Sequence, residues 1–313
     1  MKGLEIAKDF YTEWGKDYLE KSFPDLVKRV AIGRIFGSDV IGADDAISKD
    51  HKWGPQFTIF LSAADYAAHG AKVAQVMNAA APNPWKGFRL AGGGDQSVEV
   101  ESIPHWIETG LGFREKPSRN EDWDIIVKER IDGGINVARE SILYFLRHGA
   151  IWYDGSGEMT SWREALYYYP EKIWYIRLAE ELFRVWQHGE YNFVQRVAKR
   201  NDPLAKTICI GEFVHGVMNT LLLLKRDYTP YWKWIAHEFR KVDEAQRYAL
   251  LLEELTSAST AARQVDLVLK ISGEIHQTMT KSGIITEESG KYPLPLFHAH
   301  LELLAKGKVV DNR

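Results

Sequence analysis

Cysteine is nearly absent from this sequence, and long apolar runs are absent altogether. The single Cys209 cannot form a disulfide within the chain, so we expect a fold without disulfides in a reducing compartment. We interpret Cys209 as a small buried side chain rather than as a nucleophile. No segment approaches the roughly 20 uninterrupted apolar residues of a membrane-spanning helix, and the first residues lack the apolar stretch of a signal peptide. These absences predict a cytoplasmic protein with no membrane partner.

A large charge of either sign is missing as well. The formal net charge is -3 in 313 residues, which argues against a nucleic-acid partner bound through bulk electrostatics. The sequence is instead rich in tryptophan, with 11 residues. Because aromatic side chains more often fill helical interfaces than bind ligands, we interpret most of them as core. An aromatic-rich helical surface would also suit a homodimer interface.

Hydrophobic periodicity predicts an α+β fold for the N-terminal third. The first helical pattern stops at Pro24, because proline cannot continue a helix. Ser62 is a suitable N-cap for a second helix, with Asp65 at the third helical position. The expected elements in chain order are a helix over 4–22, strands over 30–36 and 57–61, a helix over 63–80, and a half-buried strand of alternating residues over 97–103.

From about Asn120 onward, the spacing of apolar residues is almost entirely helical. A chain of 313 residues exceeds the roughly 250–300 residues at which single cores stop growing, so we expect two domains. Gly112 and the stretch 117–120 interrupt both patterns, which predicts a mixed-sheet domain over 1–115 and a helical domain over 116–313. The helices expected there start near Thr160 and then cover 170–199, 203–225, 231–255, 260–281 and 296–305.

Gly37 and Ser38, followed by Asp50 and an apolar strand, resemble the nucleotidyltransferase superfamily that includes polymerase beta and the antibiotic nucleotidyltransferases. In that superfamily a Gly-Ser turn opens a helix whose backbone N–H groups bind the outer phosphates. Two carboxylates one residue apart follow on the next strand, where the two-residue period places both on one face to hold divalent metals. The resemblance therefore implies that Gly37 and Ser38 bind nucleotide.

The longer string from Gly37 to Pro55 is similar to a bacterial branch known as a domain of unknown function. That branch joins a nucleotidyltransferase-like domain to a helical C-terminal domain. The segments 153–160 (YDGSGEMT) and 228–234 (YTPYWKW) resemble the same branch, so the likeness spans most of the chain.

The resemblance implies that Asp50 is catalytic and is the first metal ligand. Lys52 stands where the superfamily has its second acid. An ammonium group there would repel a nearby cation and would contact phosphate instead, which puts two-metal catalysis of the usual form in question. The loop acids Asp39, Asp44 and Asp45 are alternatives to the missing acid, unless they are solvated turn carboxylates.

The third carboxylate of the superfamily lies on a neighbouring strand, where it helps to bind metal or accepts the proton of the attacking hydroxyl. Glu99 and Glu101 share one strand parity and are the candidate metal ligands, with Glu99 favoured as the catalytic residue. The alternative is a solvent-facing pair on an edge or half-buried strand. Trp53 is either part of the core or a platform for a purine base.

In the helical part, the resemblance implies that Lys233 reaches the triphosphate and that Tyr231 stacks or forms a hydrogen bond nearby. The alternative is a helix that starts at Pro230 with Lys233 on its solvated face.

The function implied by the resemblance is nucleotidyl transfer. A nucleoside monophosphate would move from a nucleoside triphosphate to a hydroxyl group on an unknown small-molecule or macromolecular acceptor, with magnesium or manganese as the cofactor. The alternative, motivated by Lys52, is a catalytically degenerate nucleotide-binding or regulatory protein on the same fold.

Overall fold

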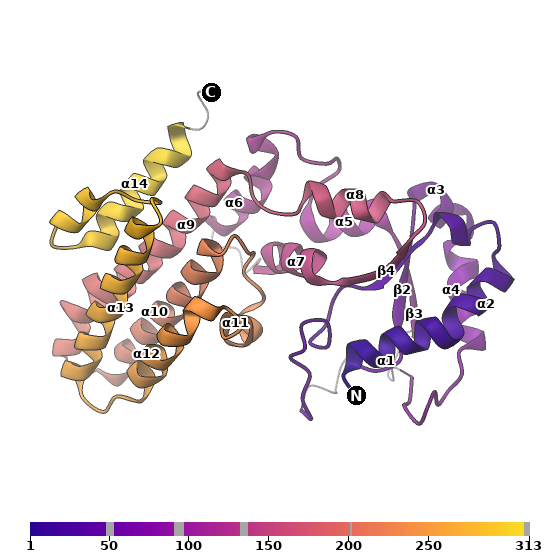
Figure 1. Cartoon of the computed structure of the whole chain (residues 1–313), viewed down its shortest axis with the longest axis horizontal. Coiled ribbons are helices and arrows are strands. Elements are labelled where there is room, and N and C mark those ends of the chain that lie inside the picture. Colours follow the sequence, from indigo (N-terminus) through magenta and orange to yellow (C-terminus); the bar gives the residue numbers. More distant parts are fainter. Residues whose placement is uncertain (48–52, 91–96, 132–136, 201, 310–313) are drawn as a thin grey trace. The chain divides into compact units, whose positions relative to one another are not determined.

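The computed structural model describes residues 1–47, 53–90, 97–131, 137–200 and 202–309. Contacts divide the chain into two compact units, Met1–Tyr167 and Tyr168–Arg313, whose elements are labelled in Figure 1. The first unit contains a mixed four-stranded sheet with helices, and the described part of the second unit is helical. This architecture confirms the predicted α+β class.

The sheet of the first unit has the strand order β3-β2-β1-β4. Strand β2 pairs parallel with β3, whereas β1 pairs antiparallel with both β2 and β4. The strands are β1 (Ala31–Arg34), β2 (Phe57–Leu61), β3 (Val98–Ser102) and β4 (Ala150–Asp154). The first three lie within the stretches expected from the sequence.

Strand β4 lies in a part of the chain where the apolar spacing predicts helices. Because β4 pairs with β1, the first unit extends to Tyr167 and includes the helices between residue 116 and that strand. The division of the structure therefore differs from the one expected after residue 115.

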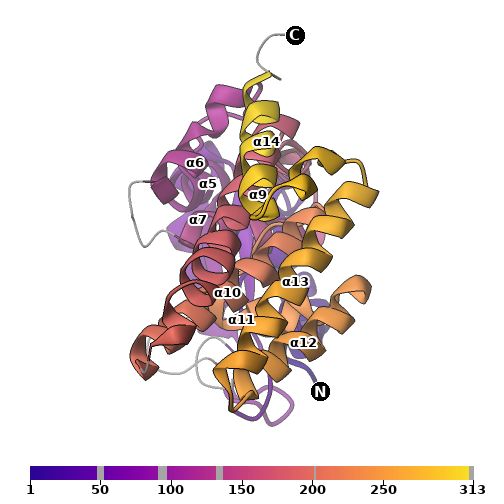
Figure 2. The same ribbon diagram turned by 90° about the vertical axis from the view of Figure 1, so that its left-hand side faces the viewer.

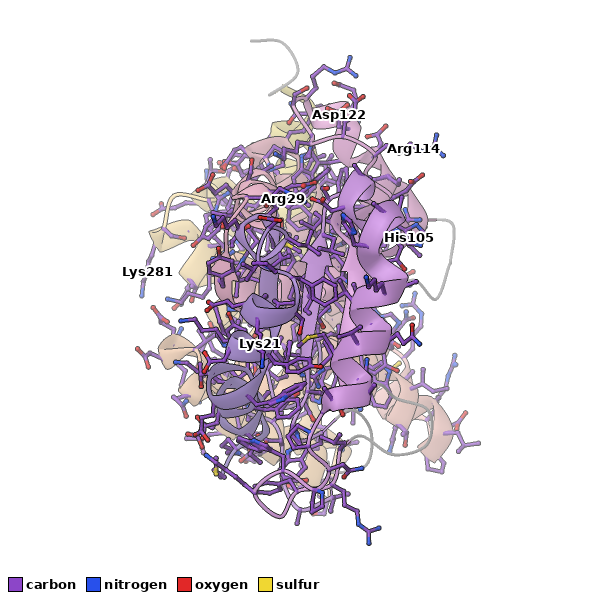
Figure 3. The ribbon with its side chains drawn as sticks, turned by 90° about the vertical axis from the view of Figure 1, so that its right-hand side faces the viewer. Lys21, Arg29, His105, Arg114, Asp122 and Lys281 are labelled. Carbon is purple, nitrogen blue, oxygen red and sulfur yellow. The ribbon has the colours of Figure 1, made fainter. Side chains whose placement is uncertain are left out.

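Two helical segments cover one face of the sheet. The first is α1 (Gly3–Phe10), η1 (Tyr11–Gly15) and α2 (Lys16–Ser22), and the second is α3 (Ala63–Asp65), η3 (Tyr66–Gly70) and α4 (Ala71–Ala80). Ser62 caps the second segment as predicted, since its hydroxyl oxygen accepts a 3.1 Å hydrogen bond from Asp65 N. Arg29, labelled in Figure 3, forms an ion pair with the Asp65 carboxylate at 2.8 Å. The apolar core on this face includes the strand residues Ile32, Ile59 and Val98 and the helical residues Ile6, Phe10 and Val73.

The opposite face of the sheet presents a different set of side chains. The register pairs Thr58 with Glu99 and Phe60 with Glu101, so these four side chains point to the same face, because side chains alternate along a strand. Helices α5 (Ile103–Leu111) and α7 (Val137–His148) pack together beside this face. The remaining elements of the unit are η2 (Val27–Arg29), η4 (Asn120–Trp123), α6 (Asp124–Ile131) and α8 (Glu158–Ala165).

The second unit is built from packed helices, seen in Figure 2. Helix α9 (Glu171–Trp186) packs against α10 (Pro203–Leu224) and α14 (Pro295–Val309), and α12 (Gln246–Ser257) packs against α13 (Ala261–Lys281). The shorter elements are η5 (Gln187–Val194), η6 (Val197–Lys199), α11 (Trp232–Phe239), η7 (Asp243–Ala245) and η8 (Glu287–Lys291). The single helix expected over 231–255 is thus two helices, α11 and α12, separated by η7.

Helix α10 is long and apolar enough, by length and composition, to cross a membrane. Half of its most apolar window is buried inside the unit, and the core helix of a folded protein meets the same criterion. Its fully or nearly buried residues include Phe213 and Leu223. Cys209 on this helix is also buried, and burial raises the pKa of its thiol, which disfavours the reactive thiolate.

Candidate functional site

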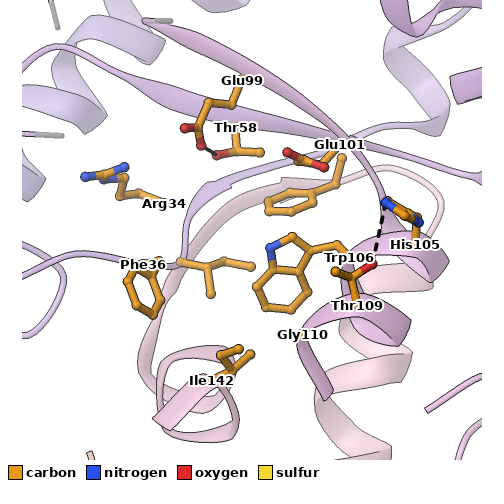
Figure 4. Close-up of a pocket in the computed structure, with 12 residues that line it drawn as sticks. Arg34, Phe36, Thr58, Glu99, Glu101, His105, Trp106, Thr109, Gly110 and Ile142 are labelled. Atoms are coloured by element: carbon orange, nitrogen blue, oxygen red, sulfur yellow. Dashed lines mark hydrogen bonds between the residues drawn. The ribbon is translucent and has the colours of Figure 1, made fainter. Parts of the chain in front are cut away.

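A cavity of about 430 Å³ lies on the sheet face that carries Thr58 and Glu99. We call it the sheet cavity. Its walls come from β1, β2 and β3, from α5, and from Ile142 on α7. The side chains drawn in Figure 4 include the polar Arg34, Thr58, Glu99, Glu101, His105 and Thr109 and the aromatic Phe36, Phe60 and Trp106.

Glu99 and Glu101 both line the sheet cavity. Strand β3 is an edge strand, and both glutamates are only partly exposed. The Thr58 hydroxyl donates a 3.2 Å hydrogen bond to Glu99 Oε2 from the neighbouring strand, shown as a dashed line in Figure 4. The pair therefore belongs to a polar wall of the cavity, and β2 holds one of its carboxylates in place.

Arg34 brings a buried positive charge to the same cavity. Its guanidinium donates to both carboxylate oxygens of Asp39, at 3.2 and 3.3 Å, and the two side chains are only 3% and 2% exposed. Gly37 lies between them with a φ of +142°, where a Cβ atom would overlap Asp39 Oδ1 and approach Arg34 Nη2 to 3.0 Å. Glycine is required at 37 because the ion pair occupies the space of a side chain.

The segment after Gly37 corrects one expectation from the superfamily pattern. Val40 N donates to Gly37 O at 3.2 Å, and Ala43 N donates to Ser38 O at 2.8 Å. Residues 38–42 thus form hydrogen-bonded turns instead of the helix that the Gly-Ser pattern implies. Any phosphate contact by Gly37 and Ser38 would rest on turn N–H groups, without the dipole of a helix.

Two of the loop acids are buried, contrary to their interpretation as solvated turn carboxylates. Asp39 is held by Arg34, as described above, and Asp44 accepts hydrogen bonds from Gly3 N at 2.8 Å and Trp53 Nε1 at 3.1 Å. Burial acts to raise the pKa of Asp44, but these hydrogen bonds and nearby Lys2 outweigh it and lower that pKa. Both carboxylates therefore have structural partners.

Asp45 is the one loop acid of the three that is exposed, and its carboxylate accepts a 2.9 Å hydrogen bond from Ile47 N. This contact is that of a turn carboxylate.

Trp53 packs with the apolar core on the far side of the sheet. It contacts that core cluster, and its ring meets Phe88 edge-on with centroids 5.9 Å apart. Of the two interpretations of Trp53, the structure favours core.

The remaining predicted residues belong to other parts of the chain. Asp50 and Lys52 lie outside the described residues. Tyr231 and Lys233 belong to the second unit, at the start of α11. Lys233 is exposed, and its Nζ atom lies 4.6 Å from the centroid of the Trp234 ring. Their proposed contacts with a nucleotide stay predictions.

The carboxylates of the cavity supply some of the ligands that a hard cation needs. Two carboxylates on one face of β3 supply the oxygen ligands that magnesium and manganese prefer. Within the described residues, no group of three or more His, Cys, Asp or Glu side chains is arranged to hold a metal ion. Glu99 and Glu101 would therefore be a partial ligand set, to be completed by substrate oxygens, water or residues outside the described ranges.

The sequence interpretation missed several residues of the cavity. Arg34 is a lone charge within the apolar stretch 30–36, and Thr58 is a polar residue within the strand 57–61. Each of these two residues indicates a polar site, because a polar residue in a buried strand needs a partner. Trp106 carried no such signal, since its place depends on how α5 packs.

Comparison with known proteins matches part of the chain to a family. Residues 136–235 match the family described as "Domain of unknown function (DUF4037)", and this range contains both 153–160 and 228–234. The match confirms the predicted resemblance to a domain-of-unknown-function branch. Among solved structures, a nucleotidyltransferase-like protein from Exiguobacterium sibiricum is 12% identical with a TM-score of 0.36, over 98% of this chain and 91% of that chain. The search of curated proteins found no match.

Proposed function

We propose that the sheet cavity binds a nucleoside triphosphate with a divalent cation, and that the protein transfers the nucleoside monophosphate to a hydroxyl acceptor. The observation that carries this proposal is the presence of the Glu99 and Glu101 carboxylates and the buried Arg34 guanidinium in one cavity of about 430 Å³. That volume lies within the roughly 300–1,000 Å³ range of small-molecule sites. The sequence resemblance at Gly37, Ser38 and Asp50 supports the same function.

Each described residue has a role that follows from its chemistry. Arg34 would bind phosphate oxygens through its planar set of N–H donors, and Asp39 would keep the guanidinium oriented. Glu99 and Glu101 would bind the cation, and Thr58 would fix the orientation of Glu99. A bound magnesium or manganese ion would supply charge stabilisation for the phosphate oxygens.

The reaction forms a bond between the acceptor oxygen and the α-phosphorus of the triphosphate. The bond from the α-phosphorus to the oxygen that bridges to the β-phosphate breaks, and pyrophosphate leaves. The proton of the acceptor hydroxyl passes to a carboxylate, for which Glu99 is our candidate.

A second function, nucleotide binding without transfer, is favoured by the lysine at position 52. In that case Lys52 would replace one cation as the positive charge beside the triphosphate, so that binding would depend little on metal.

The test is incubation of the full chain with labelled nucleoside triphosphates and either magnesium or manganese. We expect release of pyrophosphate or labelling of an acceptor, and loss of both in Glu99→Gln. The control is Glu287→Gln, which changes an exposed glutamate of η8 in the second unit and should leave turnover at the parent level. Calorimetry under the same conditions separates the two functions: metal-independent binding without turnover supports the second, and no binding at all contradicts both.

A further inference from the structure

The sheet cavity has a charged region and an aromatic region. Arg34 on β1 and Glu99 and Glu101 on β3 contribute charges. Trp106 on α5 and Phe36, which follows β1, contribute aromatic rings to the same cavity. In Figure 4 Arg34 and Glu99 lie in the upper half of the view, and Trp106, Phe36 and Ile142 lie in the lower half. A ligand that filled this cavity would need an anionic part and an apolar, planar part.

The indole of Trp106 is supported from the sheet. Its ring meets the buried ring of Phe60 edge-on, with centroids 6.1 Å apart and an interplanar angle of 81°. Phe60 is 1% exposed, so it is a fixed neighbour that restrains the indole. An aromatic side chain that is restrained in this way can stack on a ligand ring at a low cost in conformational entropy.

Phe36 adds a second ring on the other wall. It is 46% exposed, which is high for a phenylalanine beside a strand, and its ring contacts Phe145 with centroids 4.5 Å apart. Thr109 lies one helical turn after Trp106 and therefore on the same face of α5. The aromatic region thus combines ring faces with a hydroxyl group that can meet the polar edge of a ligand.

We infer that Trp106 is the platform on which the base of the nucleotide stacks, and that the cavity prefers purine over pyrimidine nucleotides. This inference rests on the proposed function. A nucleotide matches both regions, since its phosphates suit Arg34 and the cation-binding glutamates while its base is a planar ring. A purine has the larger ring face and gains more from stacking on an indole. Trp53, the platform candidate from sequence, has its indole N–H bonded to Asp44 instead.

The inference is tested by calorimetry with three probes in the presence of magnesium: ATP, CTP and inorganic tripolyphosphate. The parent protein should bind ATP more tightly than CTP and more tightly than tripolyphosphate. In Trp106→Leu, affinity for ATP should fall about tenfold, because base stacking on an aromatic residue is of that order. Affinity for tripolyphosphate should stay at the parent value, since this probe has no ring.

The matched control is Tyr292→Leu, which removes a 44% exposed aromatic ring at the end of η8 in the second unit and should change neither affinity. Thermal unfolding shows whether Trp106→Leu folds. If it does not, Trp106→Phe keeps a smaller ring and should weaken the binding of ATP, but not of tripolyphosphate, by a smaller factor. If Trp106→Leu weakens the binding of ATP and of tripolyphosphate equally, or leaves the affinity for ATP unchanged, Trp106 is not the platform for the base. Failure of the parent to bind either ATP or tripolyphosphate would contradict the proposed function itself, and the platform with it.

Discussion

The Thr58 hydroxyl donates a hydrogen bond of 3.2 Å to Glu99 Oε2, joining two parallel strands across the floor of the sheet cavity. The two residues are direct partners in the strand register, so the contact follows from the pairing of β2 with β3. A carboxylate that binds a cation depends on such neighbours for its orientation. Thr58 is therefore a positioning residue in the proposed function.

Thr58→Val should weaken metal-dependent triphosphate binding without unfolding the protein. Valine keeps the shape and the β-branch of threonine but removes the hydroxyl donor. The loss of a neighbour that orients a metal ligand costs about tenfold or more in affinity for the metal. The measurement is a magnesium titration at fixed ATP by calorimetry.

Thr207→Val is the matched control for this change. The Thr207 hydroxyl donates to Pro203 O at 2.9 Å on α10, in the second unit, so its removal should not shift the magnesium titration. An equal shift in both variants would show that Thr58 acts through stability and does not orient Glu99.

Asp39→Asn should destabilise the fold by several kcal/mol. The substitution removes the negative charge that faces the Arg34 guanidinium, whose side chain is 3% exposed. Removing one partner of a buried ion pair typically costs about 3–5 kcal/mol. Urea unfolding of the parent and the variant gives the difference in the free energy of unfolding.

Glu288→Gln provides the comparison, because Glu288 pairs with Lys291 at an exposed position where both side chains are more than half exposed. Exposed pairs contribute only about 0–1 kcal/mol. Similar losses in the two variants would mean that Asp39 is not the main partner that stabilises Arg34.

The parts of the first unit that sequence predicted well are those with strong local signals. The alternation of residues 98–102 defines which side chains of β3 share a face, and Ser62 followed by Asp65 defines a helix start. The same parity predicts that Glu99 and Glu101 line one side. These features depend on neighbours within a few residues, so no knowledge of the tertiary structure was needed.

Strand β4 could not be predicted in this way. Its partner β1 lies more than a hundred residues earlier in the chain, and β4 itself stands between helices α7 and α8. Trp106 could not be identified as a residue of the cavity for a similar reason. Trp53 lies within the string from Gly37 to Pro55, so the sequence alone draws attention to it. The place of Trp106 depends on the packing of α5 beside the sheet.

Gly33→Ala tests the unexpected pairing of β1 with β4. The register of the two strands shifts between Ile32 and Gly33, and a Cβ atom on Gly33 would overlap Ala150 O and lie 2.8 Å from Ile151 Cδ1. Because backbone cannot move aside easily, we expect a loss of about 1–3 kcal/mol in the free energy of unfolding.

Gly211→Ala is the control for the glycine change. Gly211 lies in the interior of α10, and a Cβ atom there meets nothing within 4 Å. Alanine in a helix should stabilise it by about 0.5–1 kcal/mol. A neutral Gly33→Ala variant would contradict the close approach of β4 to β1.

The ionisation of Glu190 in the second unit should make the stability of the protein depend on pH. It is 4% exposed on η5, and its Oε2 atom has no hydrogen-bond partner among the described residues. Burial raises the pKa of this carboxyl from 4.5 to about 7, against the opposing effect of a hydrogen bond from Leu296 N–H. The folded protein therefore prefers the neutral acid.

The free energy of unfolding of the parent should fall as pH rises because Glu190 ionises. Glu190→Gln should not show this fall. Below pH 4.5 the carboxyl is protonated in both the folded and the unfolded chain, so its contribution to stability is fully present. This contribution is lost as pH rises through about 7, because the carboxyl ionises more readily in the unfolded chain. The shift corresponds to at most about 3 kcal/mol. Urea unfolding across this range should show the free energy of unfolding of the variant rising relative to that of the parent as pH rises. The titrations of the partly buried His276 and His300 are common to both proteins and cancel in the difference. A difference that stays constant with pH would mean that Glu190 is already ionised, and hence solvated or paired, in the folded protein.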